Sequence, residues 1–231
     1  MRLEIFPVEG LPEIGRGDDL AQMICDAVGL AHHDIVVVTQ KIISKAEGAM
    51  AEIDPTDPLS HKPLVERESV RILRRRGELI ISQTKHGFVC ANAGIDLSNV
   101  ARGQAALLPD DSDRSARRIR DGIKGKAGVD VGVIVSDTFG RPWRRGVTDV
   151  AIGCAGVRAI IDLRGTEDAL GRTLQVTEVA LVDELACAAE LAMGKSTGFP
   201  VAVIRGGDES WFGESSVKGD LIRDPADDLF R

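Results

Sequence analysis

Short, almost uninterrupted apolar runs are the feature that most constrains the fold of this chain. Residues 34–40 (DIVVVTQ), 129–135 (VDVGVIV) and 199–207 (FPVAVIRGG) are too short and too rich in Val and Ile to be helices, so each predicts a buried strand. Because only 3% of the residues are aromatic, the core has to be built from Val, Ile, Leu and Ala. We therefore expect a sheet whose strands lie inside the protein.

Helical segments alternate loosely with these strands. An amphipathic helix is predicted after Asp18 or Asp19, a basic helix over 112–126, and an Ala-rich helix over 175–194. Neither GxGxxG nor GxxxxGK[ST] is present, and the spacing is not that of regular βαβ units. The sequence thus predicts a mixed α+β fold, in one domain over residues 1–231, rather than a Rossmann or P-loop fold.

Residues 62–77 (KPLVERESVRILRRRG) also have helical character. Leu64, Val70 and Leu73 would form the inner face of the helix, and Gly77 would end it. The arginines would lie in the last turn, where the helix dipole favours positive charge. We expect a solvated helix end here rather than a binding site.

The composition excludes several classes of protein. A net charge of −7 argues against a general nucleic-acid binder, which needs a basic face to neutralise phosphates. No apolar run approaches the roughly 20 residues of a membrane span, and acidic residues and prolines come too early for a signal peptide. The cysteines show no CxxC spacing and are expected to be reduced core thiols. We expect a cytoplasmic protein.

Polar residues concentrate at the ends of the predicted strands, where sites usually lie. The relevant segments are 38–45 (VTQKIISK), 91–99 (ANAGIDLSN), 136–146 (SDTFGRPWRRG) and 205–210 (RGGDES).

The residue types in these segments suit a site for a metal ion and a polyphosphate. Asp96, Asp137 and Glu209 offer the hard oxygen ligands that Mg²⁺ and Mn²⁺ prefer, and Thr138 adds a hydroxyl. Lysines and arginines bind phosphate or carboxylate groups. Taken singly, an aspartate after a strand is more often a turn or cap residue, and spacing alone does not show that the segments converge.

Together, residues 136–156 (SDTFGRPWRRGVTDVAIGCAG), 38–48 (VTQKIISKAEG), 94–100 (GIDLSNV) and 9–20 (EGLPEIGRGDDL) resemble the F420-0 gamma-glutamyl ligase family over nearly the whole chain. The resemblance implies GTP-dependent addition of L-glutamate to coenzyme F420-0 through an acyl phosphate, with release of GDP and phosphate. It implies two divalent ions (Mn²⁺ or Mg²⁺) and K⁺ as an activator. It also implies a two-lobed, intertwined homodimer, either a stand-alone enzyme or the N-terminal domain of a longer one.

The same resemblance assigns roles to individual residues. It implies nucleotide contacts for Leu11, Pro12, Glu13, Ile14, Gln40, Lys45 and Asn99. It implies that Asp96 and Asp137 bind one metal ion and that Thr138 binds the second. Glu209 is the weakest assignment to the second ion, because its loop varies in the family and Asp208 is an equal rival.

The arginines of the 136–146 segment have no role from the family. From their chemistry we expect Arg141 and Arg144 to face phosphate or carboxylate groups of the substrate, with Pro142 and Trp143 stiffening the turn. Two other functions fit the same residues. One is a metal-dependent phosphohydrolase or kinase that needs no glutamate, and the other is a catalytically silent GTP-binding module.

Overall fold

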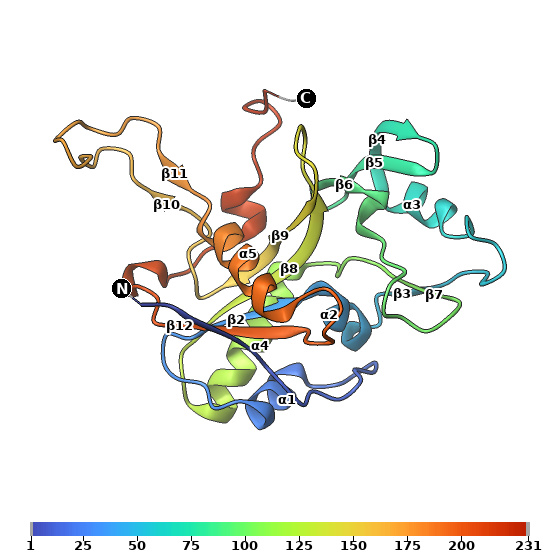
Figure 1. Cartoon of the computed structure of the whole chain (residues 1–231), viewed down its shortest axis with the longest axis horizontal. Helices are drawn as coiled ribbons and strands as arrows, with labels where there is room; N and C mark the ends of the chain where they lie inside the picture. Colours follow the sequence, from blue (N-terminus) through green and yellow to red (C-terminus); the bar gives the residue numbers. More distant parts are fainter. Residues whose placement is uncertain (1, 230–231) are drawn as a thin grey trace.

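A five-stranded sheet forms the centre of the protein, as seen in a computed structural model that describes residues 2–229. The ends of the expected 1–231 domain lie outside these described residues. The strand order is β1-β12-β2-β8-β9 (Figure 1). In that order, the strands are Glu4–Pro7, Val201–Arg205, Ile35–Thr39, Gly132–Gly140 and Val147–Ala155. β2 and β8 run parallel, and the other neighbouring strands pair antiparallel.

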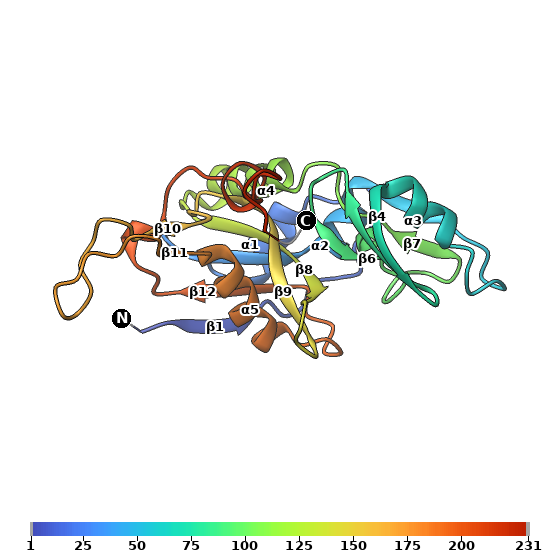
Figure 2. The ribbon, with the colours of Figure 1, turned by 90° about the horizontal axis from the view of Figure 1, so that it is seen from above.

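Helices cover both faces of this sheet, as Figure 2 shows. α1 (Leu20–Ala27) and α4 (Ser112–Ala127) lie on one face, and α5 (Leu181–Met193) lies on the other. Side chains alternate along a strand, so Val36 and Val38 pack towards α1 and α4 while Ile35 and Val37 pack towards α5. Burial on both faces explains why the predicted strands are apolar at every position.

The remaining elements form smaller units beside the central sheet. β3 (Met50–Glu52) pairs with β7 (Gln104–Ala106), and β10 (Ile161–Asp162) pairs with β11 (Glu178–Val179). α2 (Gln40–Glu47) directly follows β2. A three-stranded sheet lies at one end of the molecule with α3 (Figure 2); its strands are Ser69–Arg76 (β4), Leu79–Thr84 (β5) and Val89–Ala91 (β6). The α+β class is confirmed.

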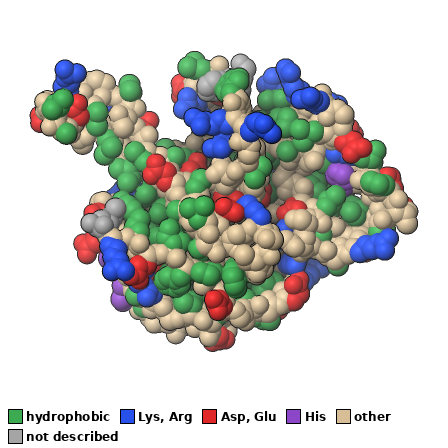
Figure 3. All heavy atoms as spheres, in the orientation of Figure 1, with side chains coloured by type: hydrophobic (Ala, Val, Ile, Leu, Met, Phe, Trp, Pro, Cys, Tyr) green, Lys and Arg blue, Asp and Glu red, His purple; other side chains and the backbone are tan. Residues whose placement is uncertain are grey.

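The prediction of a helix over residues 62–77 is wrong in its second half. α3 covers only Lys62–Glu68, and β4 then pairs with β5 through a turn at Gly77 and Glu78. Gly77 has φ 58°, a conformation that ends helices and also closes tight hairpins, so the glycine signal was ambiguous. Val70 is 70% exposed rather than part of an inner face. Lys and Arg side chains gather over β4 in Figure 3.

Other expected elements are present with changed limits. The basic helix α4 has nearly its expected bounds, whereas α5 begins at Leu181 instead of Gln175 because β11 occupies part of the expected helix. β8 does not end at Val135, as expected, but continues to Gly140 and pairs with β9. The cysteines are free thiols, two of them buried. No helix among the described residues combines the length and apolarity needed to cross a membrane.

Gly153 marks the closest approach of α4 to the sheet. A Cβ atom at this position would lie 2.3 Å from the backbone carbon of Ser112 at the start of α4. We expect Gly153→Ala to lower the free energy of unfolding by about 2 kcal/mol, the usual scale for overpacking a core, because neither backbone can yield without moving α4. Gly140→Ala is the matched control, since its added Cβ meets nothing within 4 Å. Equal urea denaturation midpoints for the two variants would contradict this packing argument.

Candidate active site

A pocket of about 340 Å³ opens at the carboxyl ends of β2 and β8. Thr39 and Ser136 lie opposite each other at the end of the parallel pairing, and from there β2 passes into α2 while β8 continues to Gly140. Other walls come from the loop before α1, the loop before β7 and the turn between α5 and β12. In open α/β sheets, ligands commonly bind beyond the carboxyl ends of parallel strands.

Most of the residues singled out from the sequence line this pocket. They come from segments that are far apart in the chain, and they are Leu11, Pro12, Glu13, Ile14, Gln40, Lys45, Asp96, Asn99, Asp137 and Thr138. Spacing in the sequence could not show that these residues meet beyond the carboxyl end of β2.

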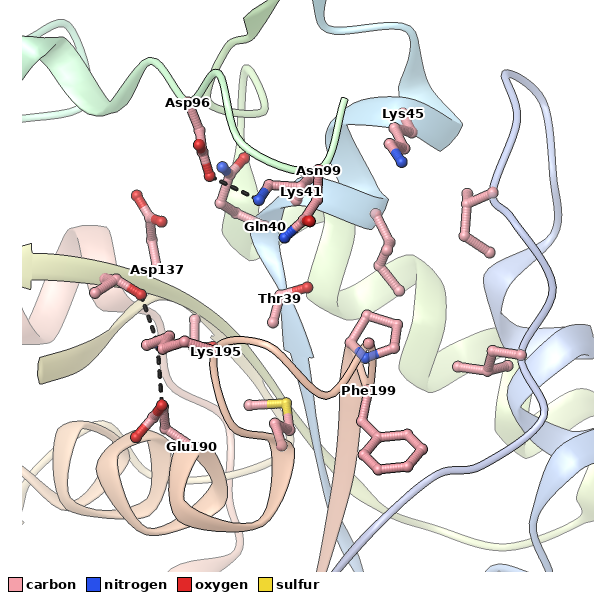
Figure 4. A pocket seen from close by; sticks show the side chains of 18 of the residues that line it. Thr39, Gln40, Lys41, Lys45, Asp96, Asn99, Asp137, Glu190, Lys195 and Phe199 are labelled. Carbon is pink, nitrogen blue, oxygen red and sulfur yellow. Dashed lines mark hydrogen bonds and ion pairs between the residues drawn. The ribbon is translucent and has the colours of Figure 1, made fainter. Parts of the chain in front are cut away.

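Asp96 and Asp137 face each other across one side of the pocket, as Figure 4 shows. Lys41 forms an ion pair with Asp96 at 2.8 Å. Burial would raise the pKa of Asp96, but hydrogen bonds from Lys41 and Ser98 outweigh burial and lower it. For Asp137, burial and the nearby charges of Asp96 and Asp149 raise the pKa to about 7. The pocket therefore concentrates negative charge that is incompletely neutralised.

This pair of carboxylates fits a divalent cation, because a bound cation would offset the burial and the like-charge repulsion that raise the pKa of Asp137. Within residues 2–229, no group of three or more His, Cys, Asp and Glu side chains could hold a metal ion. A Mg²⁺ or Mn²⁺ ion at Asp96 and Asp137 would thus need further oxygen ligands from water or from a bound phosphate. Mg²⁺ sites built on one or two carboxylates plus substrate phosphates are of this kind.

The start of α2 supplies hydrogen-bond donors to the same pocket. Thr39 is at the N-cap position but makes no capping hydrogen bond, which leaves the first backbone N–H groups of α2 without a side-chain partner. Gln40 is 2% exposed, and its Nε2 has no hydrogen-bond partner, while its Oε1 accepts from Ser44. Unpaired donors at a helix N-terminus favour an anionic ligand.

Lys45 and Glu13, both expected to contact a nucleotide, contact each other. Lys45 Nζ lies 2.5 Å from Glu13 Oε1, and this ion pair joins α2 to the loop before α1. Glu13 is mostly exposed whereas Lys45 is mostly buried. The pair can therefore open towards solvent and release the ammonium to a phosphate.

The pocket also contains a group of charged residues that were not expected from the sequence. Lys195, in the turn after α5, contacts Asp149 and Thr138, and it forms a longer ion pair with Glu190 (Figure 4). Asp149 is 2% exposed although it lies in the apolar strand β9. Asp149 could have been found from the sequence, because it is a charged residue within an otherwise apolar strand. Lys195 could have been found because it lies among the polar residues that precede the strand β12.

Glu209 lies beyond the opposite ends of the strands, away from the carboxyl end of β2 where the pocket lies. β12 runs antiparallel to β2, so the segment after Arg205 starts beside Asp34, with which Arg205 forms an ion pair at 2.6 Å. Glu209 and its rival Asp208 do not line the pocket. Within one chain, neither residue can share a metal ion with Thr138.

The arginines of the 136–146 segment do not line the pocket either. Arg141 and Arg144 lie in the exposed turn between β8 and β9. Trp143 in the same turn is 84% exposed and has φ 57°. The expected contacts of these arginines with substrate remain a prediction.

Comparison with known proteins places the chain in a family. The family model described as F420-0:gamma-glutamyl ligase matches residues 10–206. The chain belongs to this F420-0:gamma-glutamyl ligase family. The coenzyme F420:L-glutamate ligase of Methanopyrus kandleri is 41% identical to it, with 100% of this chain and 98% of the relative covered. The protein of the same name from Methanothermobacter thermautotrophicus is 42% identical, with 89% and 90% covered.

The burial of Asp137 beside other carboxylates predicts an effect on stability. Because the pKa of Asp137 is raised in the folded protein, stability should fall as the pH rises above the unfolded value near 4 and through about 7. In EDTA at pH 8, Asp137→Asn should raise Tm by about 5 °C, and this gain should shrink at pH 5. Asp208→Asn is the control, since the pKa of Asp208 is lowered by Ser210 and its loss should not raise Tm. A pH-independent Tm difference, measured by scanning fluorimetry, would contradict this charge assignment.

Proposed function

We propose that this protein is a ligase that joins L-glutamate to coenzyme F420-0, using GTP as the source of energy. Membership of the ligase family and relatives named coenzyme F420:L-glutamate ligase support the reaction. The observation that carries it is the convergence of the expected nucleotide residues and the Asp96–Asp137 pair in one pocket. Guanine as the base comes from the family resemblance.

The reaction needs two steps, because the carbonyl carbon of a carboxylate is a poor electrophile for attack by an amine. In the first, an oxygen of the F420-0 carboxylate attacks the γ-phosphorus of GTP, and GDP leaves. In the second, the amine of glutamate attacks the carbonyl carbon of the acyl phosphate, the C–O bond to phosphate breaks, and the amine loses a proton. Phosphoryl transfer of this type is catalysed mainly by positioning and by neutralising charge.

The residues of the pocket fit these tasks. The N-terminus of α2, the unpaired amide of Gln40 and the ammonium of Lys45 would bind the phosphates. Leu11 to Ile14 and Asn99, on the walls of the pocket, would contact the rest of the nucleotide. Asp96 and Asp137 would hold Mg²⁺ or Mn²⁺, which supplies charge neutralisation for the transferred phosphoryl group. From the same family resemblance, we propose that K⁺ activates the protein and that it forms a homodimer.

The direct test is an incubation of the purified protein with coenzyme F420-0, L-glutamate, GTP and Mn²⁺, followed by mass spectrometry. A product that is heavier by one or more glutamyl units and absent without GTP is the expected result. GDP without such a product would favour the phosphohydrolase. Stabilisation by GTP without any turnover would favour the silent binding module.

Asp137→Asn should abolish detectable turnover, because the amide replaces an anionic oxygen ligand. It should also remove the increase in Tm that Mn²⁺ produces in the wild-type protein. Asp208→Asn, at the opposite edge of the sheet, should retain both properties. Wild-type activity in the Asp137 variant would refute the metal assignment.

Lys45→Ala should weaken GTP binding about tenfold, which corresponds to about 1.4 kcal/mol, because it removes a phosphate-binding charge. Isothermal titration with a non-hydrolysable GTP analogue measures this directly. Lys124→Ala is the matched control, since Lys124 pairs with Asp130 far from the pocket. Unchanged affinity in the Lys45 variant would show that this lysine has a structural role only.

A further inference from the structure

Lys195 places its ammonium group among oxygen atoms on the β8–β9 side of the pocket. Its Nζ lies 2.5 Å from Asp149 Oδ1, 2.7 Å from Thr138 Oγ1 and 3.5 Å from Glu190 Oε1. The side chain reaches this position from the short turn between α5 and β12 (Figure 4). One positive charge is thus held by side chains from two strands and a helix.

The positive charge of Lys195 compensates the buried negative charge of Asp149. Its carboxylate is almost fully buried, and a buried carboxylate without a counter-charge is strongly destabilising. The Thr138 hydroxyl donates to Asp149 Oδ1 at 2.7 Å and accepts from Lys195. The ammonium therefore already occupies the oxygens through which Thr138 and Asp149 could bind a cation.

A divalent ion cannot share these oxygens with Lys195. Mg²⁺ binds oxygen at about 2.1 Å, so an ion bound to both Thr138 Oγ1 and Asp149 Oδ1 would lie within about 4 Å of the ammonium nitrogen. Two positive charges at such a distance, in a partly buried site, repel strongly. The residues present at this position do not fit a second metal ion as long as Lys195 stays there.

The Asp96–Asp137 side of the pocket differs in this respect. Lys41 pairs with Asp96, but none of the ion pairs among the described residues includes Asp137. Asp137 and Thr138 are neighbours on β8, and alternation directs them to opposite faces of the strand. Asp137, on one face, therefore has no ion pair among the described residues, whereas Asp149, on the other face, is paired with Lys195.

We propose that the ammonium of Lys195 takes the position of the second divalent ion, so that each active site binds a single divalent ion, at Asp96 and Asp137. This inference rests on the proposed function, which supplies the metal and the nucleotide. Lysine has three N–H donors, and Thr138 and Asp149 accept from two of them. The third is then available to a phosphate oxygen of the nucleotide, because Glu190 lies beyond normal hydrogen-bond distance.

The test is a count of bound Mn²⁺ ions by equilibrium dialysis against Mn²⁺ and a non-hydrolysable GTP analogue. Metal and nucleotide are both measured in each compartment. We expect one Mn²⁺ per bound nucleotide in the wild-type protein and two in Lys195→Ala. Lys195→Arg, which keeps the positive charge, and Lys124→Ala, which removes a distant lysine, should both bind one.

Electron paramagnetic resonance gives a second readout that does not depend on activity. Two Mn²⁺ ions at a distance of about 4 Å are magnetically coupled, whereas a single ion gives an isolated six-line spectrum. Coupling should therefore appear in Lys195→Ala alone. If that variant does not fold, Lys195→Gln, which keeps an N–H donor towards Asp149, replaces it with the same expected count.

The outcomes separate this inference from the proposed function. Two Mn²⁺ ions in the wild-type protein, or a single ion in the folded Lys195→Ala variant, would overturn the role of Lys195 and leave the ligase proposal intact. No bound Mn²⁺ in the wild-type protein would overturn both the metal-dependent mechanism and this inference. The mass-spectrometric assay decides independently whether the ligase reaction occurs.

Discussion

The site depends on the parallel pairing of β2 with β8. Ile35 to Thr39 lie opposite Gly132 to Ser136, so the start of α2 lies beside the last residues of β8. The backbone of α2 and the carboxylate of Asp137 meet there because β2 and β8 pair in this register. Asp96 and the turn carrying Lys195 are then added from other parts of the chain.

Alternation along β8 divides the pocket into two regions of different charge. Asp137 lies on the same face as Val135 and meets Asp96, whereas Thr138 lies on the same face as Ile134 and meets Asp149 and Lys195. In the first region Asp137 has no ion pair among the described residues, whereas in the second the buried carboxylate of Asp149 is paired with Lys195. Two adjacent residues of one motif therefore have different chemical environments.

Local patterns predicted elements well where burial and periodicity agreed. β2 and α4 follow the expected apolar run and the expected basic helix. The prediction failed at β4, because Arg71 to Arg76 have good helix propensity and Gly77 suits a helix end as well as a hairpin turn. Pairing with β5 decided the outcome, and a partner strand across a turn is not encoded in helix propensity.

The sequence by itself determined which residue types could do chemistry. The 136–146 motif, together with segments 38–48, 94–100 and 9–20, indicated the ligase family. Asp96, Asp137, Gln40 and Lys45 were identified in this way, because strand ends and family motifs are local properties. Only the tertiary structure decided which of them meet. It placed Glu209 outside the pocket of its own chain, because β12 runs antiparallel to β2. It also added Lys195 and Asp149, because charge pairing across distant segments depends on how strands and helices pack in space.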